Sequence, residues 1–440
     1  MPRGIQDTAG PTGPLGVGLL GVGVVGSAVA ESLMSGFRRP RAGLGRNLEL
    51  RAAVVRDLSR KRPVPPELLS NDPRTVLEND AIDIVVELMG GEEPAHEYIA
   101  RALESGKHVV TANKEVLAKH GDELHDLAAE KGAHLLYEAS VGGGIPIVGP
   151  LSSDLLGNEV LSIRAIINGT TNYILTRMSV VGLTFDAALR EAQSLGYAEA
   201  DPTSDVDGFD ALYKIAILAR LAFRTSVPLE AIYREGIRGV HAEDIKYANT
   251  LGFTIKLLAV ARREDNGLLV RVHPALIPSG VPMAKVDGVL NVCEVEGDLV
   301  GPLWLQGRGA GARPTASAVM GDLIRIARRP KTVREDRGNE SSLRLLSMAE
   351  HECQYYLRLV ARDRPGVLAK VAGVLGRLRI SIASVIQMDT DPDKGVADII
   401  LTTHPSREAQ MQRAVREIAG LDVVPEVASL LRVESYPETV

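Results

Sequence analysis

The sequence has few features of a secreted or nucleic-acid-binding protein. Only two cysteines occur in 440 residues, and Cys293 and Cys353 lie far apart in the chain. This scarcity argues against a disulfide framework, and the reducing cytoplasm is the expected compartment. The formal net charge is −6, whereas nucleic-acid-binding proteins usually have a basic surplus. We therefore expect no nucleic-acid partner.

Long hydrophobic runs are also missing. The most apolar stretch, residues 15–30, imitates a signal peptide because it ends in Ala28-Val29-Ala30. It is too short to span a membrane and is interrupted by glycines, so we expect no membrane attachment. Residues 1–14, which are rich in proline and glycine, are expected to form a disordered leader. The remaining length suits several globular domains.

The glycines after the first apolar run predict a dinucleotide site. A strand from Leu15 to Leu20 leads into Gly21-x-Gly23-x-x-Gly26, and a helical pattern follows. Such glycines permit a tight turn, close approach of pyrophosphate and close helix packing. The motif alone is weak, and a turn that binds no nucleotide is the alternative. The residues expected to contact the cofactor are Gly21, Gly23, Val24, Val25 and Gly26.

The next strand bears on the choice between NAD and NADP. It runs from Leu48 to Val55 and ends at Arg56, where NAD-preferring sites usually carry an acid. Arg56 and Lys61 could pair with a 2′-phosphate, which favours NADP, although Asp57 is adjacent. A solvated basic loop is the alternative.

Further strands alternate with helices through residue 150. This alternation predicts an α/β fold with a doubly wound parallel sheet of the Rossmann type over residues 15–150. Ligands bind at the carboxyl ends of the strands in such sheets. Thr111, Lys114 and Glu138 fall at these ends and are therefore candidate site residues.

An acidic stretch in the middle of the chain leads into an apolar helix. Five carboxylates occur between Glu199 and Asp210, but Lys214 stands where a calcium loop needs its last glutamate. A solvated acidic loop is the alternative. Asp210 and Lys214 are four residues apart, so they share one face of the helix and are expected to be buried as a pair. Burial tunes the pKa of a lysine for proton transfer.

Several blocks together resemble homoserine dehydrogenase over about residues 15–330. They are Gly21–Gly26, Thr111–Lys114, Glu138–Pro146, Asn168–Asn172, Gly196–Pro202 and Gly307–Ser317. The resemblance implies reversible reduction of L-aspartate 4-semialdehyde to L-homoserine with NADP or NAD, in threonine, methionine and isoleucine biosynthesis. It also implies an α+β catalytic and dimerisation domain over residues 151–311, a helix over 312–328 that rejoins the first domain, and a homodimer or homotetramer.

The resemblance also implies residue roles. Lys214 resembles the proton donor, and Lys114 resembles a second lysine near nicotinamide and substrate. Substrate-binding positions by the same resemblance are Glu199, Asp210, Gly169 and Thr170. Gly311 resembles a further cofactor contact. A monovalent cation such as Na⁺ would be held by an oxygen of Glu138 and the backbone carbonyls of Val141, Gly143 and Ile145.

Two other functions compete with this interpretation. Aspartate-semialdehyde dehydrogenase would need a reactive cysteine, but Cys293 lies in an expected strand and Cys353 in an expected linker. A catalytically silent sensor of dinucleotide and amino acid would be favoured by loss of Lys214 or Glu199, and both residues are present. No cluster with zinc-site spacing is evident, and residues 351–353 are assigned to the linker.

The last ninety residues are expected to be regulatory. After a linker over residues 329–350, strand and helix patterns over 351–440 follow the order βαββαβ. The start Asp363-Arg364-Pro365-Gly366-Val367-Leu368 resembles an ACT domain, which implies an amino-acid effector near Asp363 and Gly366. Threonine feedback is the hypothesis, and a domain that only dimerises the enzyme is the alternative.

Overall fold

The structure is a computed structural model that describes residues 13–35, 46–328, 343–391 and 393–436. The chain divides into two compact units, residues 1–154 with 310–340 and residues 155–309 with 341–440. The expected leader lies almost entirely outside the described residues. No helix in the described part of the chain is long and apolar enough to cross a membrane.

The first unit is built on a six-stranded parallel sheet. Its strand order, β3-β2-β1-β4-β5-β6, is that of dinucleotide-binding folds and confirms the expected doubly wound sheet. The strands are β1 (Leu15–Leu20), β2 (Leu48–Val54), β3 (Leu69–Ser70), β4 (Ile84–Glu87), β5 (His108–Thr111) and β6 (Leu135–Leu136). Residues of β1 are buried throughout, as an apolar central strand requires.

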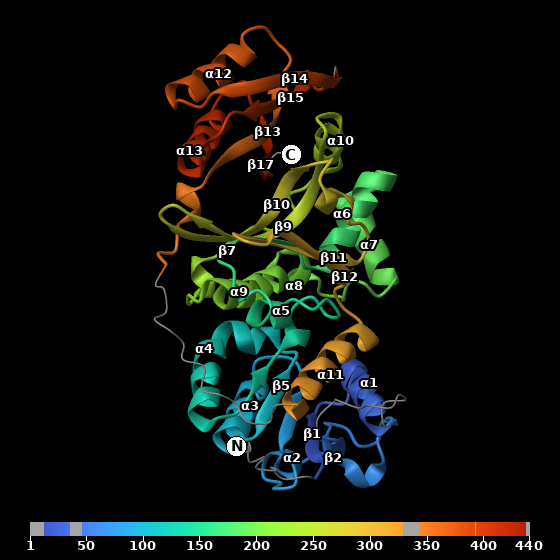
Figure 1. Cartoon of the computed structure of the whole chain (residues 1–440). Helices are drawn as coiled ribbons and strands as arrows, with labels where there is room; N and C mark the ends of the chain where they lie inside the picture. Colours follow the sequence, from blue (N-terminus) through green and yellow to red (C-terminus); the bar gives the residue numbers. More distant parts are fainter. Residues whose placement is uncertain (1–12, 36–45, 329–342, 392, 437–440) are drawn as a thin grey trace. The chain divides into compact units, whose positions relative to one another are not determined.

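Helices from distant parts of the sequence complete this unit. They are α1 (Val24–Met34), α2 (Arg74–Leu77), α3 (Ala95–Glu104), α4 (Lys114–Lys131), α5 (Val148–Ser152) and α11 (Ala312–Arg328). Helix α11 packs beside α1 (Figure 1). Its buried Val319, Leu323 and Ile326 join Val17 and Leu19 of β1 in one hydrophobic core. The late helix is therefore part of the nucleotide-binding unit.

The second unit contains a mixed sheet covered by helices. Its strands before residue 310 are β7 (Val160–Ile166), β8 (Tyr233–Arg234), β9 (Phe253–Glu264), β10 (Gly267–Pro278), β11 (Leu290–Gly297) and β12 (Gly301–Arg308). Its helices are α6 (Gly169–Val181), α7 (Phe185–Ser194), α8 (Thr203–Val206), α9 (Phe209–Phe223) and α10 (Ala242–Thr250). Helix α9 packs on β9 and β10, which places its buried face against the sheet.

The C-terminal part of the second unit has the expected βαββαβ order. Its main elements are β13 (Glu352–Arg362), α12 (Val367–Arg377), β14 (Ile382–Asp391), β15 (Val396–Thr403), α13 (Glu408–Ala419) and β17 (Glu426–Val433), with a short β16 (Ser406–Arg407). Val371 and Leu375 of α12 and Met411 of α13 are buried in its own core. The ACT fold is thereby confirmed.

The described part of the expected linker, residues 343–350, packs along the sheet, whereas Cys353, also expected in the linker, lies in a strand. The Leu268 amide of β10 donates to the Arg344 carbonyl, so this segment lies along the sheet. His351 is buried, and Cys353 lies in β13, paired with Ser406. The charged composition of the segment hid these contacts, because the partners come from distant strands.

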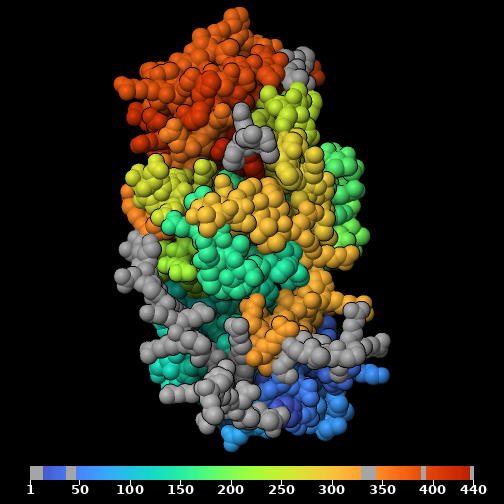
Figure 2. Space-filling model, in the orientation of Figure 1, coloured from blue at the N-terminus to red at the C-terminus, as the bar shows by residue number. Residues whose placement is uncertain are grey.

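The ACT strands continue the sheet formed by β7 and β9 to β12. Strand β17 pairs with β13 on one side and with β10 on the other. The resulting eleven-stranded sheet has the order β12-β11-β7-β9-β10-β17-β13-β15-β14, and the short strands β8 and β16 pair at its side with β10 and β13. In the space-filling view, orange and red atoms of the ACT region lie against the yellow-green atoms of α10 (Figure 2). The ACT region and the sheet of residues 160–308 are therefore parts of one folded body.

Buried ion pairs hold this junction together. The Glu434 carboxylate, just after β17, accepts hydrogen bonds from Arg164 of β7 (3.1 Å) and Arg271 of β10. All three side chains are almost fully buried. Burial acts to raise the pKa of Glu434, but Arg271 and Arg164 outweigh it and lower the pKa. Removal of the last strand would leave a cationic site in the sheet without this carboxylate, which is costly.

A second buried cluster ties α10 to the ACT strands. Asp244 of α10 accepts from Arg358 of β13 at 2.6 Å and from Ser429 of β17 at 2.6 Å. Burial opposes ionisation of Asp244, yet the Arg358 contact lowers its pKa below the ordinary value. Both clusters therefore contain charges that are paired rather than isolated, as buried charges require.

Candidate active site

The glycine turn of the first unit has the geometry that a pyrophosphate needs. Gly21 has φ +100°, a conformation that disfavours side chains, and a Cβ at Gly26 would lie 2.2 Å from the Gly21 carbonyl oxygen. A Cβ at Gly23 would meet no atom within 4 Å, so the backbone there faces open space. Val24 and Val25 begin α1, whose N-terminal amides suit an anion. Gly21 thus permits the turn, Gly23 leaves the backbone accessible to a ligand, and Gly26 permits close packing of α1 against the turn.

The end of β2 presents cations beside this turn. Arg56 and Lys61 are exposed, while Asp57 Oδ1 is engaged by the amide (2.9 Å) and hydroxyl (2.6 Å) of Ser59. Hydrogen bonds from Ser59 lower the pKa of Asp57. Arg62, to which the sequence analysis gave no role, donates to the Val22 carbonyl of the glycine turn at 3.3 Å. The loop after β2 is therefore attached to the glycine turn through an arginine.

Thr111 lies in a buried polar network rather than on an open surface. Its hydroxyl donates to Glu87 at 2.6 Å and accepts from the Asn113 amide at 2.9 Å. Burial raises the pKa of Glu87, although bonds from Thr111 and Met89 oppose the rise. The network fixes the ends of β4 and β5 immediately before Lys114, the first residue of α4.

Glu138 organises the loop that follows β6. Its carboxylate accepts from the amides of Ile147 (2.7 Å), Val148 (2.9 Å) and Gly149 (2.6 Å), which caps α5. Its own amide donates to Asp322 of α11 at 2.8 Å. Burial raises the pKa of Asp322 to about 7. The Glu138 carboxylate therefore holds the loop in place through its three amide hydrogen bonds.

The same loop offers main-chain oxygens to a cation. Gly142 and Gly143 have φ +73° and +57°, which turns the backbone sharply. No hydrogen bond from a described residue reaches the carbonyls of Val141, Gly143 or Ile145. These oxygens fit a hard monovalent ion, and the Glu138 side chain, already bonded to three amides, fits the role of support.

Asp210 and Lys214 form the expected buried pair at the start of α9. Lys214 Nζ donates to Asp210 Oδ2 at 2.6 Å and to the Ile167 carbonyl at 2.7 Å. Their side chains are 5% and 11% exposed, so the pair is shielded from bulk water. The four-residue spacing predicted this contact correctly, whereas the carbonyl at the end of β7 could not be inferred from sequence.

Asn168 and Asp205 extend this cluster. The Asn168 amide donates to Asp205 (2.6 Å) and to Asp210 (2.9 Å), and its side-chain oxygen caps α6 at Thr171. Burial and the neighbouring Asp210 raise the pKa of Asp205. The sequence analysis missed Asp205 because the acidic stretch contains five similar carboxylates.

The other substrate candidates differ in setting. Gly169 begins α6, and Thr170 is buried and donates to the Tyr197 carbonyl at 2.7 Å. Glu199 is exposed in the loop after α7. The structure thus joins Thr170 to the Tyr197 loop and leaves the Glu199 carboxylate accessible to solvent.

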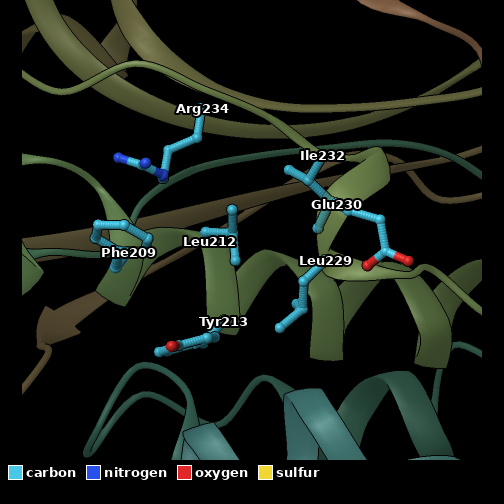
Figure 3. A pocket seen from close by; sticks show the side chains of 7 residues that line it. All are labelled: Phe209, Leu212, Tyr213, Leu229, Glu230, Ile232 and Arg234. Atoms are coloured by element: carbon cyan, nitrogen blue, oxygen red, sulfur yellow. The ribbon is translucent and has the colours of Figure 1, made fainter.

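A separate cavity opens on another face of α9. It has a volume of about 380 Å³ and is lined by Phe209, Leu212, Tyr213, Leu229, Glu230, Ile232 and Arg234 (Figure 3). Arg234 stacks on Phe209, 3.6 Å from the ring centroid, and donates to the Asp207 carbonyl. The cavity includes neither Asp210 nor Lys214, so it is distinct from the candidate catalytic pair.

The two cysteines are unsuited to covalent catalysis. Cys293 is buried in β11, and Cys353 lies in β13. Burial raises the pKa of each thiol to about 12, so neither is a thiolate near neutral pH. This removes the thiolate that aspartate-semialdehyde dehydrogenase chemistry would require.

The remaining candidates lie at turns. Gly311 has φ +123° just before α11. Gly366 has φ +88° and precedes α12, while the Asp363 amide donates to the Gly395 carbonyl at 3.0 Å. Gln387 of β14 donates to Asp363 at 3.4 Å. The effector candidates therefore lie in a glycine turn joined to two neighbouring ACT segments.

Comparison with known proteins identifies families along most of the chain. A family model described as homoserine dehydrogenase matches residues 146–324, and one described as homoserine dehydrogenase, NAD binding domain, matches residues 21–138. A model of the ACT domain matches residues 355–422. The three matches follow the order of the sequence motifs.

Individual relatives cover nearly the whole chain. A homoserine dehydrogenase of Synechocystis sp. is 45% identical over 413 residues, which are 90% of this chain and 94% of the relative. The crystal structure of a homoserine dehydrogenase from Thiobacillus denitrificans has a TM-score of 0.89 and 42% identity, covering 96% of this chain and 98% of that one. A hyperthermophilic archaeal homoserine dehydrogenase in complex with NADPH has a TM-score of 0.61 and 32% identity, covering 71% and 97%.

Proposed function

The chain belongs to the homoserine dehydrogenase family, and on that premise we propose which of its residues carry the reaction. Enzymes of this family interconvert L-aspartate 4-semialdehyde and L-homoserine with a nicotinamide dinucleotide. The observation that carries the proposal is the buried contact of Lys214 with Asp210 and the Ile167 carbonyl. We propose a cytoplasmic enzyme, as the cysteine content favours, that works as a homodimer or homotetramer.

Lys214 is the proton donor in the direction of aldehyde reduction. The glycine turn after β1 would hold the reduced nicotinamide dinucleotide, which would supply the hydride for the aldehyde carbon. As the carbonyl π bond breaks, negative charge builds on oxygen, and the Lys214 ammonium stabilises it and transfers a proton to it. Asp210 and the Ile167 carbonyl hold the amine in place, and Asn168 holds Asp210. In oxidation of homoserine, the neutral amine removes the hydroxyl proton.

Other residues bind and orient the substrate. Glu199 and Asp210 have the charge that an α-ammonium group requires, and Gly169 and Thr170 shape the turn at the start of α6. Lys114, the first residue of α4, is the second lysine of the reaction. These roles rest on the matched family motifs together with the local geometry of each residue.

We expect Lys214→Ala to lower kcat for L-homoserine oxidation by about 10²–10⁴-fold, because the positioned acid–base group is lost. Lys214→Arg keeps a charge but cannot give up its proton near neutral pH, so it should be similarly slow. Steady-state rates from nucleotide absorbance measure the effect, and fluorescence of bound NADPH should show nucleotide affinity unchanged. Lys285→Ala, at an exposed lysine of the same unit, is the control. A near-normal kcat for Lys214→Ala would exclude this role.

We propose NADP as the preferred cofactor. Arg56 and Lys61 are exposed cations after β2, and Asp57 is engaged by its own turn. A charge-assisted hydrogen bond contributes about 1.5–3 kcal/mol, so removing both cations should lower the NADP-to-NAD ratio of kcat/KM at least about tenfold. The comparison is wild type against Arg56→Ala/Lys61→Ala, with Arg51→Ala as a control on exposed β2 charge. An unchanged ratio would assign the two cations to the solvated surface.

We propose that Na⁺ or a similar monovalent ion binds the loop after β6. The carbonyls of Val141, Gly143 and Ile145 and the main-chain oxygen of Glu138 would hold it, and the Glu138 carboxylate would keep the loop in shape. At constant ionic strength, replacing Na⁺ by N-methylglucamine should lower kcat/KM severalfold, and added Na⁺ should restore it. Equal rates in the two salts would argue against the ion.

We propose threonine feedback through the ACT region. A deletion of this region is a poor test, because it removes Glu434 from Arg164 and Arg271. A point variant is sharper: L-threonine should inhibit the wild type, and Asp363→Ala should raise the inhibitory concentration at least about tenfold through loss of a charged contact. Glu417→Ala, which removes the ion pairs of α13 with Arg377 and Arg413, is the control. If L-threonine does not inhibit the wild type, the result would favour the alternative that the ACT region only dimerises the enzyme.

A further inference from the structure

Two histidines from neighbouring helices of the first unit lie face to face. His96 is in the first turn of α3, and His120 is on α4. Their ring centroids are 4.0 Å apart with an interplanar angle of 19°. Both side chains are partly buried, and carboxylates surround them. The proposed catalytic and cofactor roles use neither histidine.

Each histidine has one ring nitrogen positioned by a carboxylate. His96 Nδ1 lies 3.1 Å from Glu93, and His120 Nε2 lies 2.8 Å from Glu92. Metal-binding histidines almost always engage a carboxylate, carbonyl or water in this way, which orients the ring and makes the other nitrogen a better ligand. A histidine nitrogen positioned by a carboxylate therefore occurs twice in this cluster.

The opposite nitrogen of His96 lacks a hydrogen bond. Within the described residues no hydrogen-bond partner reaches His96 Nε2, although the atom is buried. Its nearest carboxylate is Glu123, whose Oε2 lies 3.6 Å away. A buried polar atom without a partner costs about 1–3 kcal/mol. A cation between these two atoms would satisfy both.

Glu123 completes a three-ligand set. It follows His120 by three residues on α4, so the two share a helix face, as in histidine and glutamate pairs of helical metal sites. One ligand atom from each of His96, His120 and Glu123 can be chosen so that all lie within 4.8 Å of one another. The Glu123 side chain is 64% exposed, which gives an ion access from solvent.

The surrounding charge also favours a divalent ion. Glu92, Glu93 and Glu123 bring three carboxylates to the cluster, and Lys119, which pairs with Glu92 and Glu115, is the nearby cation. Two imidazoles with one carboxylate suit Zn²⁺, Co²⁺ or Ni²⁺, whereas Mg²⁺ and Ca²⁺ prefer oxygen ligands.

We propose that His96, His120 and Glu123 form a binding site for a divalent transition-metal ion, with Glu93 and Glu92 as orienting partners. The ion joins α3 to α4, the helix that begins with Lys114. Water fills the remaining coordination position. The site is built from residues of the first unit alone and does not depend on the proposed catalytic roles.

The test uses the full-length protein after treatment with a chelator. Titration with Co²⁺, followed by visible absorption, and with Zn²⁺, followed by calorimetry, should show one ion bound per chain at this site and a raised Tm. His96→Gln and His120→Gln should each lower affinity at least about 100-fold and abolish the Tm rise. Glu93→Gln, which leaves all three ligands in place, should lower affinity about 10–100-fold.

A second histidine pair supplies the matched control. His108 and His134 of the same unit have ring centroids 5.0 Å apart, and His134→Gln should bind the ion as the wild type does. The Tm of each variant is also measured without metal. A value equal to that of the metal-free wild type shows that the variant has lost a metal ligand and not its fold. Absence of Co²⁺ binding, or wild-type affinity in both His96→Gln and Glu93→Gln, would overturn the proposal. These readouts are independent of dehydrogenase activity.

Discussion

The contact between Lys214 and Asp210 is the constraint on which the catalytic region is organised. An amine and a carboxylate this far from bulk water are stable only if they pair and find further acceptors or donors. Asn168 and the Ile167 carbonyl meet that need, and they lie where β7 ends and α6 begins. The turn after β7 and the first turn of α9 are therefore fixed by one small polar cluster, which leaves Lys214 Nζ little freedom.

Local sequence patterns predicted the parts of the fold that depend on near neighbours. Gly21, Gly23 and Gly26 could be assigned because their spacing is that of a single tight turn between a strand and a helix. The Asp210 and Lys214 pair followed from helical periodicity alone. The alternation of strands and helices likewise predicted the order of the ACT elements. In each case the decisive contacts join residues that are close in the chain.

Contacts between distant segments could not be predicted in the same way. Glu434 bonds to Arg164 and Arg271, which are 270 and 163 residues away, and a lone glutamate after a strand gives no sign of such partners. Asp205 could not be distinguished from its acidic neighbours, and the His96 and His120 pair depends on how α3 meets α4. The packing of the charged segment before β13 could not be inferred from sequence for the same reason. Its contact with β10 exists only in the folded chain.

The shared sheet gives a physical basis for regulation within the second unit. Strand β10 pairs with β17 of the ACT region and also packs under α9, which carries Lys214. An effector can alter catalysis only by binding two states of this body with different affinity. Because Glu434 joins β17 to β7 and β10 through buried charges, a shift of β17 must move these strands with it or separate a buried ion pair. Separation is strongly unfavourable in a dry interior, so concerted movement of the sheet is the favoured route from the proposed effector turn to α9.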